Sequence, residues 1–189
     1  MADQFEECFN RGGTFADMGK YDEAVVWYDR ALALKPDDAD TWLVRGIALN
    51  DAGRYAEGLV SFDRVIAQRP DDAPAWINRG NALQALGKYS EAVGSYDRAL
   101  AINPAFFGAW VFRGAALSSL GKHVEAIGSC DRAIAEFSDL DEAWYIRGIA
   151  YGRLGMFAEA VESYDRAIAI NPDNTEAKKM REDALRQKK

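Results

Sequence analysis

The sequence predicts an all-α protein in which one pair of helices is repeated along the chain, and three observations predict it. A set of residues recurs every 34 positions, each repeat contains two segments with the apolar spacing of an amphipathic helix, and glycine and proline separate these segments at fixed places. Repeats of this length cannot bury an apolar face alone, so neighbouring copies stack and share a continuous core. The expected architecture is therefore an α-solenoid.

The period is clearest in the residue types that recur at it. They are the tryptophans Trp42, Trp76, Trp110 and Trp144, and two glycine series at Gly12, Gly46, Gly80, Gly114, Gly148 and at Gly19, Gly53, Gly87, Gly121, Gly155. Asp-Arg pairs recur at residues 29–30, 63–64, 97–98, 131–132 and 165–166. The repeats are residues 5–38, 39–72, 73–106, 107–140 and 141–174. We predict a single domain over residues 1–189.

Each repeat is predicted to form two helices of about 14 residues. In the third repeat the first helix carries Trp76 and Gly80 one turn apart and ends before Gly87. The second helix begins near Tyr89 and ends before Pro104, because proline cannot continue a helix and restricts the residue before it. Helices this short are marginal alone, so packing between them must hold the fold.

Residues 175–187 predict one further helix that no second helix follows. Its apolar residues should contact the fifth repeat; they are Ala177, Met180, Ala184 and Leu185. Lys178 stands at the place of the tryptophan and Glu182 at the place of the glycine, which makes the outer face polar. A polar outer face is what a terminal cap needs to keep a solenoid soluble.

Composition excludes several classes of function. The formal net charge is −7 and no basic stripe interrupts it, so we expect neither nucleic acid nor an anionic membrane as a partner. The two cysteines, Cys8 and Cys130, are far apart and in no metal-ligand spacing, which suits a reducing compartment. No export signal or apolar run long enough to span a membrane is present, so the expected location is cytoplasmic.

The recurring residues resemble the tetratricopeptide repeat, a 34-residue helix-turn-helix family. The third repeat carries its pattern at Trp76, Gly80, Leu83, Gly87, Tyr89, Ala92, Tyr96, Ala99 and Pro104. The resemblance implies a right-handed superhelical solenoid of antiparallel helix pairs, with the first helices lining a concave groove and the second helices facing outward. It also implies a protein or peptide partner, since such arrays mostly act as adaptors. The chain departs from the family in one respect: the seventh residue of every repeat is arginine, where the family usually has leucine. These arginines are Arg11, Arg45, Arg79, Arg113 and Arg147.

The resemblance places a set of mostly apolar side chains on or beside the groove. They are Phe9, Leu43, Ile47, Ile77, Asn78, Asn81, Val111, Phe112, Tyr145 and Ile149. A known subclass of the family binds the carboxylate terminus of heat-shock chaperones through groove lysines and asparagines, but Ile77 and Val111 stand where that clamp needs charge, so the clamp is absent. The expected partner is an apolar or amphipathic protein or peptide segment. The alternative is that these apolar residues pack between adjacent first helices, and that Asn78 and Asn81 are residues the repeat commonly carries.

No catalytic site is expected, and no cofactor or metal. His123 is the only histidine and stands where other repeats carry Tyr or Phe, which favours a packing role. The aspartates of the Asp-Arg pairs recur in every repeat, and an active site copied five times in the same register would be unusual. The competing functions are a self-associating structural module, which would make the chain a weak homo-oligomer, and a recruiting domain of a larger assembly or enzyme.

Two expectations concern the contacts between repeats. The arginine at position 7 should pair with the aspartate of the preceding repeat, giving Asp29–Arg45, Asp63–Arg79, Asp97–Arg113, Asp131–Arg147 and Asp165–Arg181. The fourth repeat should open before its neighbours, because His123, Cys130 and Ser138 replace two aromatic residues and a proline.

Overall fold

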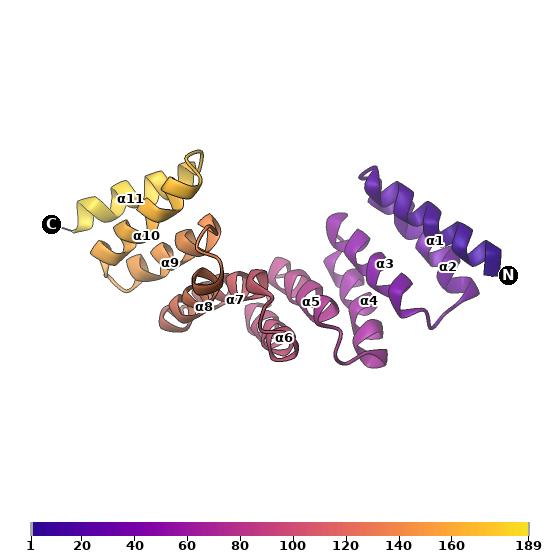
Figure 1. The fold of residues 1–189 in the computed structure, drawn as a ribbon. Coiled ribbons are helices and arrows are strands. Elements are labelled where there is room, and N and C mark those ends of the chain that lie inside the picture. Colours follow the sequence, from indigo (N-terminus) through magenta and orange to yellow (C-terminus); the bar gives the residue numbers. More distant parts are fainter. Residues whose placement is uncertain (1, 189) are drawn as a thin grey trace. The chain divides into compact units, whose positions relative to one another are not determined.

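A computed structural model describes residues 2–188 of the chain. Within that range it contains eleven helices and no strand, in two compact units, Met1–Ile102 and Asn103–Lys189. The N-terminal unit contains α1 (Ala2–Asp17), α2 (Tyr21–Leu34), α3 (Ala39–Asp51), α4 (Tyr55–Gln68), α5 (Ala73–Ala85) and α6 (Tyr89–Ile102). The C-terminal unit contains α7 (Phe107–Ser119), α8 (His123–Glu136), α9 (Asp141–Arg153), α10 (Phe157–Ile170) and α11 (Thr175–Gln187). The predicted all-α fold of repeated helix pairs is confirmed (Figure 1), whereas the single domain over residues 1–189 stays a prediction.

A glycine ends the first helix of every repeat. Gly87 has a φ of 73°, in the left-handed region that side chains with a Cβ disfavour. Its N–H donates to the Gln84 carbonyl at 2.9 Å, and the N–H of Lys88 donates to the Leu83 carbonyl at 2.8 Å. These bonds satisfy the last carbonyls of α5 and reverse the chain direction, so that α6 lies beside α5.

A second glycine lets the two helices of a repeat cross closely. A Cβ added at Gly80 of α5 would lie 2.4 Å from the ring of Tyr96 on α6, which is fully buried. Gly12, Gly46 and Gly148 face Tyr28, Phe62 and Tyr164 in the same way, at 2.4 to 2.5 Å. In the fourth repeat the residue opposite Gly114 is Cys130, whose sulfur would lie 3.0 Å from the added Cβ. The crossing is therefore tightest where an aromatic ring fills it.

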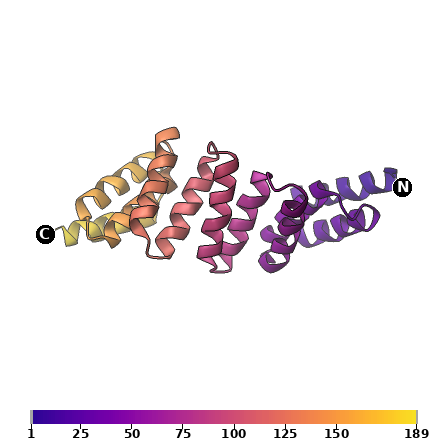
Figure 2. The same cartoon turned by 90° about the horizontal axis from the view of Figure 1, so that it is seen from below.

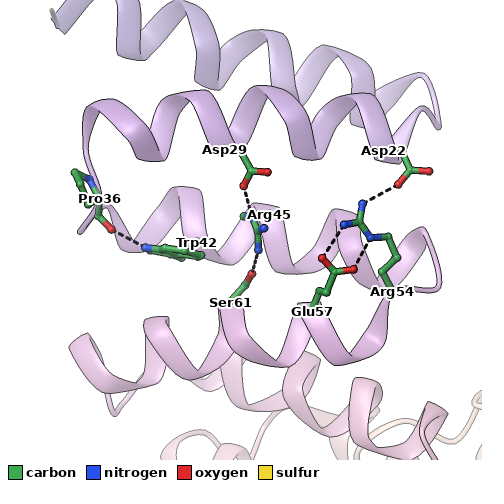
Figure 3. A network of polar contacts seen from close by, with 8 residues as sticks. All are labelled: Asp22, Asp29, Pro36, Trp42, Arg45, Arg54, Glu57 and Ser61. Carbon is green, nitrogen blue, oxygen red and sulfur yellow. Dashed lines mark hydrogen bonds and ion pairs between the residues drawn. The ribbon is translucent and has the colours of Figure 1, made fainter.

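Four tryptophans each bond the loop that precedes their own helix. The Nε1 of Trp42 donates to the carbonyl of Pro36, in the preceding loop, at 2.7 Å (Figure 3). The same bond recurs from Trp76, Trp110 and Trp144, at 2.9, 3.1 and 2.8 Å. Ser138 supplies the last of these acceptors, so the bond needs the backbone carbonyl at this place and not the proline ring.

The arginine at position 7 joins three helices. The Nε of Arg45 donates to Asp29 Oδ1 on α2 at 2.6 Å, and its Nη1 donates to Ser61 Oγ on α4 at 2.8 Å (Figure 3). The serine partner recurs at Ser95, Ser129 and Ser163, each of them buried. The aspartate pairing predicted from the sequence does not include this serine partner.

Four of the five predicted Asp-Arg pairs are confirmed. Asp29–Arg45, Asp63–Arg79 and Asp131–Arg147 have N–O distances of 2.6, 2.8 and 2.8 Å, and Asp165 pairs with Arg181. The fifth pair, Asp97–Arg113, would join the two units and stays a prediction.

Helix α11 packs against α10 and α9 as a terminal helix (Figure 2). Ala177 and Ala184 are buried against the fifth repeat, as expected. Met180 and Leu185 are each 39% exposed; Met180 lines a cavity together with residues of α9 and α10, and the expected contact of Leu185 stays a prediction. Only the two alanines fit the close contact, and the longer side chains lie at its margins.

Two first helices begin without a side-chain cap. Asp38, Asp72 and Asn174 accept a backbone N–H at the start of α3, α5 and α11, at 2.8 to 2.9 Å. Phe106 and Leu140 occupy the same place before α7 and α9 and make no such bond. A cap of this kind contributes about 1 kcal/mol. The fourth repeat therefore lacks a cap at its own start and at the start of its successor.

The glycine crossing predicts unequal costs for one substitution. G80A should destabilise the chain by about 1–3 kcal/mol, because the added methyl meets the buried Tyr96 ring. G114A should be nearly neutral, because the Cys130 sulfur can yield by a few tenths of an ångström and alanine favours the helix by about 0.5–1 kcal/mol. Urea unfolding of each variant measures the difference. G94A is the control: nothing lies within 4 Å of its added Cβ, so it should stabilise α6. Equal costs for G80A and G114A would contradict this account of the crossing.

The arginine link predicts an asymmetry between its partners. D63N should cost at most about 1 kcal/mol, because the Asp63 side chain is 57% exposed and exposed pairs contribute little. R79A should cost about 2–3 kcal/mol, because Arg79 is 25% exposed and loses its ion pair, its bond to Ser95 and the packing of its stem. Denaturant midpoints of the two variants test this. If D63N lowers the free energy of unfolding as much as R79A does, the ion pair with Asp63 accounts for the stabilisation, and the bond to Ser95 and the packing of the arginine stem do not.

Candidate partner-binding surface

The first helices of successive repeats lie next to one another within each unit. Helix α3 packs against α5 in the N-terminal unit, and α9 packs against both α7 and α11 in the C-terminal unit. The predicted binding residues therefore fall into two sets. The N-terminal set is Phe9, Leu43, Ile47, Ile77, Asn78 and Asn81, and the C-terminal set is Val111, Phe112, Tyr145 and Ile149.

The apolar residues of the N-terminal set divide into two kinds. Phe9 packs against Phe5 and Tyr28, with ring centroids 6.1 Å apart in both pairs, and so contributes to the core of the first repeat. Leu43, Ile47 and Ile77 are each half-buried. These three side chains keep part of their surface accessible on α3 and α5, and they remain candidates for contact with a partner.

Asn78 and Asn81 lie one turn apart on α5, and each uses half of its amide inside the protein. The Nδ2 of Asn78 donates to the Pro74 carbonyl at 2.9 Å. The Oδ1 of Asn81 accepts from the hydroxyl of Tyr96 at 2.9 Å. Among residues 2–188, no bond engages the Oδ1 of Asn78 or the Nδ2 of Asn81. The Oδ1 of Asn78 is therefore a free acceptor and the Nδ2 of Asn81 a free donor. Both side chains are half-buried and lie three residues apart on one face of α5.

The C-terminal set is more deeply packed. Val111 is 3% exposed and lies in a core cluster with Cys130 and Ile146, so the alternative of packing between adjacent helices describes this residue. Tyr145 and Ile149 are half-buried and pack against the cluster that contains Tyr164. The ring centroids of Tyr145 and Tyr164 are 6.1 Å apart. Only the outer parts of Tyr145 and Ile149 remain available.

The potentially reactive side chains give no catalytic arrangement. His123 is half-buried at the start of α8, consistent with the expected packing role. Burial raises the pKa of the Cys130 thiol to about 12, so this cysteine is not a nucleophile at neutral pH. In the part of the chain that the structure describes, no three His, Cys, Asp or Glu side chains form a metal site. None of the described helices is long and apolar enough to cross a bilayer.

A cavity of about 300 Å³, which the recurring residues do not predict, lies between α9, α10 and α11. Its walls include Ile149, Phe157 and Met180, and the hydroxyl end of Tyr164 lies next to Gly152. The signal was present in the sequence, because Gly152 stands where the second, third and fourth repeats carry Asn50, Gln84 and Ser118. In the third repeat the side chain of Gln84 lies beside the hydroxyl of Tyr96, and the fifth repeat has no side chain at that place.

Two family models match the sequence. The model described as Tetratricopeptide repeat matches residues 73–106 and 141–174, and the model described as TPR repeat matches residues 12–53. Together the matches cover more than half of the chain. No curated protein sequence matches it.

Solved structures share the fold over most of the chain. MamA from Desulfovibrio magneticus RS-1 superposes with a TM-score of 0.85 at 20% identity, over 92% of this chain and 98% of that one. YrrB, described as a TPR protein with an unusual peptide-binding site, gives 0.80 at 22% identity, over 93% and 90%. A tetratricopeptide repeat protein from Parabacteroides merdae gives 0.86 at 19% identity, over 98% and 73%. Identities this low establish the fold alone.

The two cysteines predict a labelling pattern that reports on the fourth repeat. At pH 8 iodoacetamide should modify the half-buried Cys8 first, because the raised pKa of Cys130 keeps that thiol protonated and burial blocks access. Labelling of Cys130 then requires local opening, which we expect to be faster in residues 107–140 than in residues 73–106. Mass spectrometry of labelled peptides measures the labelling of each cysteine, and hydrogen exchange measures the opening of each of the two repeats. Equal protection of these repeats would refute the expected weakness of the fourth.

Proposed function

Because the chain belongs to the tetratricopeptide repeat family, we propose that it is a protein-interaction scaffold that binds a peptide segment of a partner along its first helices. The half-buried apolar side chains on α3 and α5 support an apolar or amphipathic segment. The likeness to YrrB, whose description names a peptide-binding site, is consistent with this class of ligand. No residue of the chain points to a reaction that the scaffold itself would perform.

The free halves of the Asn78 and Asn81 amides are the observation that carries the proposal. An extended peptide presents a carbonyl acceptor and an N–H donor at neighbouring places along its backbone. The Nδ2 of Asn81 donates to that carbonyl and the Oδ1 of Asn78 accepts from that N–H, while Ile77 contacts the adjoining side chain. A backbone grip of this kind selects an extended segment, and the apolar neighbours select its side chains.

The groove residues also define which partners bind poorly. Ile77 has no charge with which to compensate the carboxylate at a peptide terminus, so burying that carboxylate beside it is unfavourable. We propose that the ligand is an internal apolar segment and that the chaperone-type carboxylate clamp is absent. Affinity for such a segment depends weakly on salt, because few of the contacts join opposite charges.

Peptides selected from a random phage-displayed library against the whole chain test the proposal. N81D should weaken the selected peptides by about tenfold or more, since a carbonyl acceptor then faces an oxygen. The substitution keeps the oxygen that accepts from Tyr96, so the fold is retained. Isothermal titration calorimetry measures the affinities, and circular dichroism checks the helical content.

N103D is the matched control. It introduces the same charge on an exposed residue whose Oδ1 already accepts from the Ala105 N–H at 3.0 Å, and it should leave affinity unchanged. Equal affinity of wild type and N81D would place the peptide elsewhere and reject the α5 grip. Light scattering over a concentration series identifies self-association, the competing function, by a mass that rises in the absence of peptide.

A further inference from the structure

The cavity between α9, α10 and α11 differs chemically from its counterpart in the third repeat. There, the hydroxyl of Tyr96 lies 2.9 Å from Asn81 Oδ1 and 3.2 Å from Gln84 Oε1, so its hydrogen bond is made inside the repeat. The fifth repeat carries Ile149 and Gly152 at these two places, and both acceptors are lost.

Tyr164 is consequently left with an unused hydroxyl. The residue is 2% exposed, yet within residues 2–188 its hydroxyl makes no hydrogen bond, and it borders the cavity. Burial raises the pKa of this hydroxyl, so it remains a donor over the whole physiological range. Because this hydroxyl lies at the cavity and has no acceptor within the protein, it is available to donate to an acceptor on a bound molecule.

Charged groups border the same cavity. The guanidinium of Arg153 makes no ion pair or hydrogen bond among the described residues. Asp183 supplies an acceptor and lies 3.6 Å from Arg186, which partly compensates its charge. The cavity thus combines an apolar wall with the donors of Tyr164 and Arg153, the carboxylate of Asp183 and the amide of Gln187, which both donates and accepts. Its volume of about 300 Å³ is at the lower end of the range for ligand pockets, and is suited to one large side chain with its peptide groups.

We propose that this cavity is an anchor site for one large apolar side chain of a bound peptide. The apolar side chain packs against Ile149, Phe157 and Met180. A backbone carbonyl of the peptide accepts from Tyr164 and Arg153, and a backbone N–H of the peptide donates to Asp183. The inference rests on the proposed peptide-binding function and adds a second site in the C-terminal unit. A peptide fits better than a carboxylate, because Asp183 would repel an anion at the same place.

N-acetylleucine N-methylamide, one apolar side chain between two peptide groups, is the probe. Titrated into the whole ¹⁵N-labelled chain, it should shift the amide signals of Gly152, Arg153 and Asp183 with millimolar affinity. Y164F should weaken the probe by about tenfold, the effect of one lost hydrogen bond, while the ring continues to fill the crossing.

G152Q is the decisive variant. A Cβ at this position meets only the Tyr164 hydroxyl, at an ordinary 3.8 Å, and glutamine favours the helix more than glycine. The melting temperature should therefore not fall, while the new amide occupies the cavity, bonds Tyr164 as Gln84 bonds Tyr96, and abolishes the shifts. S118Q makes a comparable change at the same position of the fourth repeat and should leave the probe bound.

Two results would overturn the inference. Shifts that persist in G152Q would show that the probe binds outside the cavity. Tighter binding of hexanoate than of the probe would make the site one for apolar carboxylates. Neither result touches the peptide grip on α5, which the N81D measurement decides separately.

Discussion

Each junction between two helix pairs that the structure describes within a unit depends on one guanidinium shared by three helices. Arg45 binds the carboxylate of the preceding repeat on one side and the buried hydroxyl of its own second helix on the other. The carboxylate is about half exposed, so most of the value of this link lies in fixing where α3 sits between α2 and α4. A leucine at this position would fill space without choosing between neighbouring registers, whereas the planar guanidinium accepts only partners at set directions.

The ends of the array show what the link requires. In the first repeat Trp27 stands at the place of the serine, and among residues 2–188 Arg11 pairs with Glu7 and lies 4.6 Å from the centroid of the Trp27 ring. In α11, Arg181 pairs with Asp165 and has no serine partner among the described residues. The arginine therefore forms an ion pair even where one of its two usual partners is not present.

Periodicity predicted the helices, their turns and the Asp-Arg pairs, because each depends on residues that recur in register. It did not predict the depth of a side chain, since depth depends on what lies opposite in one particular repeat. Val111 is buried in a cluster with the small side chain of Cys130, while Leu43 and Ile77 are half-buried in repeats that carry Phe62 and Tyr96 at the place of Cys130. Periodicity did not predict the cavity at Gly152 for the same reason. The cavity forms because residue 152 has no side chain, and this position is not part of the recurring pattern.

The residues that form the scaffold and those that vary on it are therefore different sets. Glycine, tryptophan and arginine fix the crossing and the junction, and they leave the ninth and twelfth positions of the first helix free to change. At these positions Asn81 and Gln84 close the third repeat around the hydroxyl of Tyr96, while Ile149 and Gly152 leave that of Tyr164 open. A tyrosine at the same place of the repeat is thus hydrogen-bonded inside the protein in one repeat and faces a cavity in another. Changes at two positions outside the recurring glycine, tryptophan and arginine are enough to make that difference, because the arginine link and the glycine crossing of the fifth repeat are both kept.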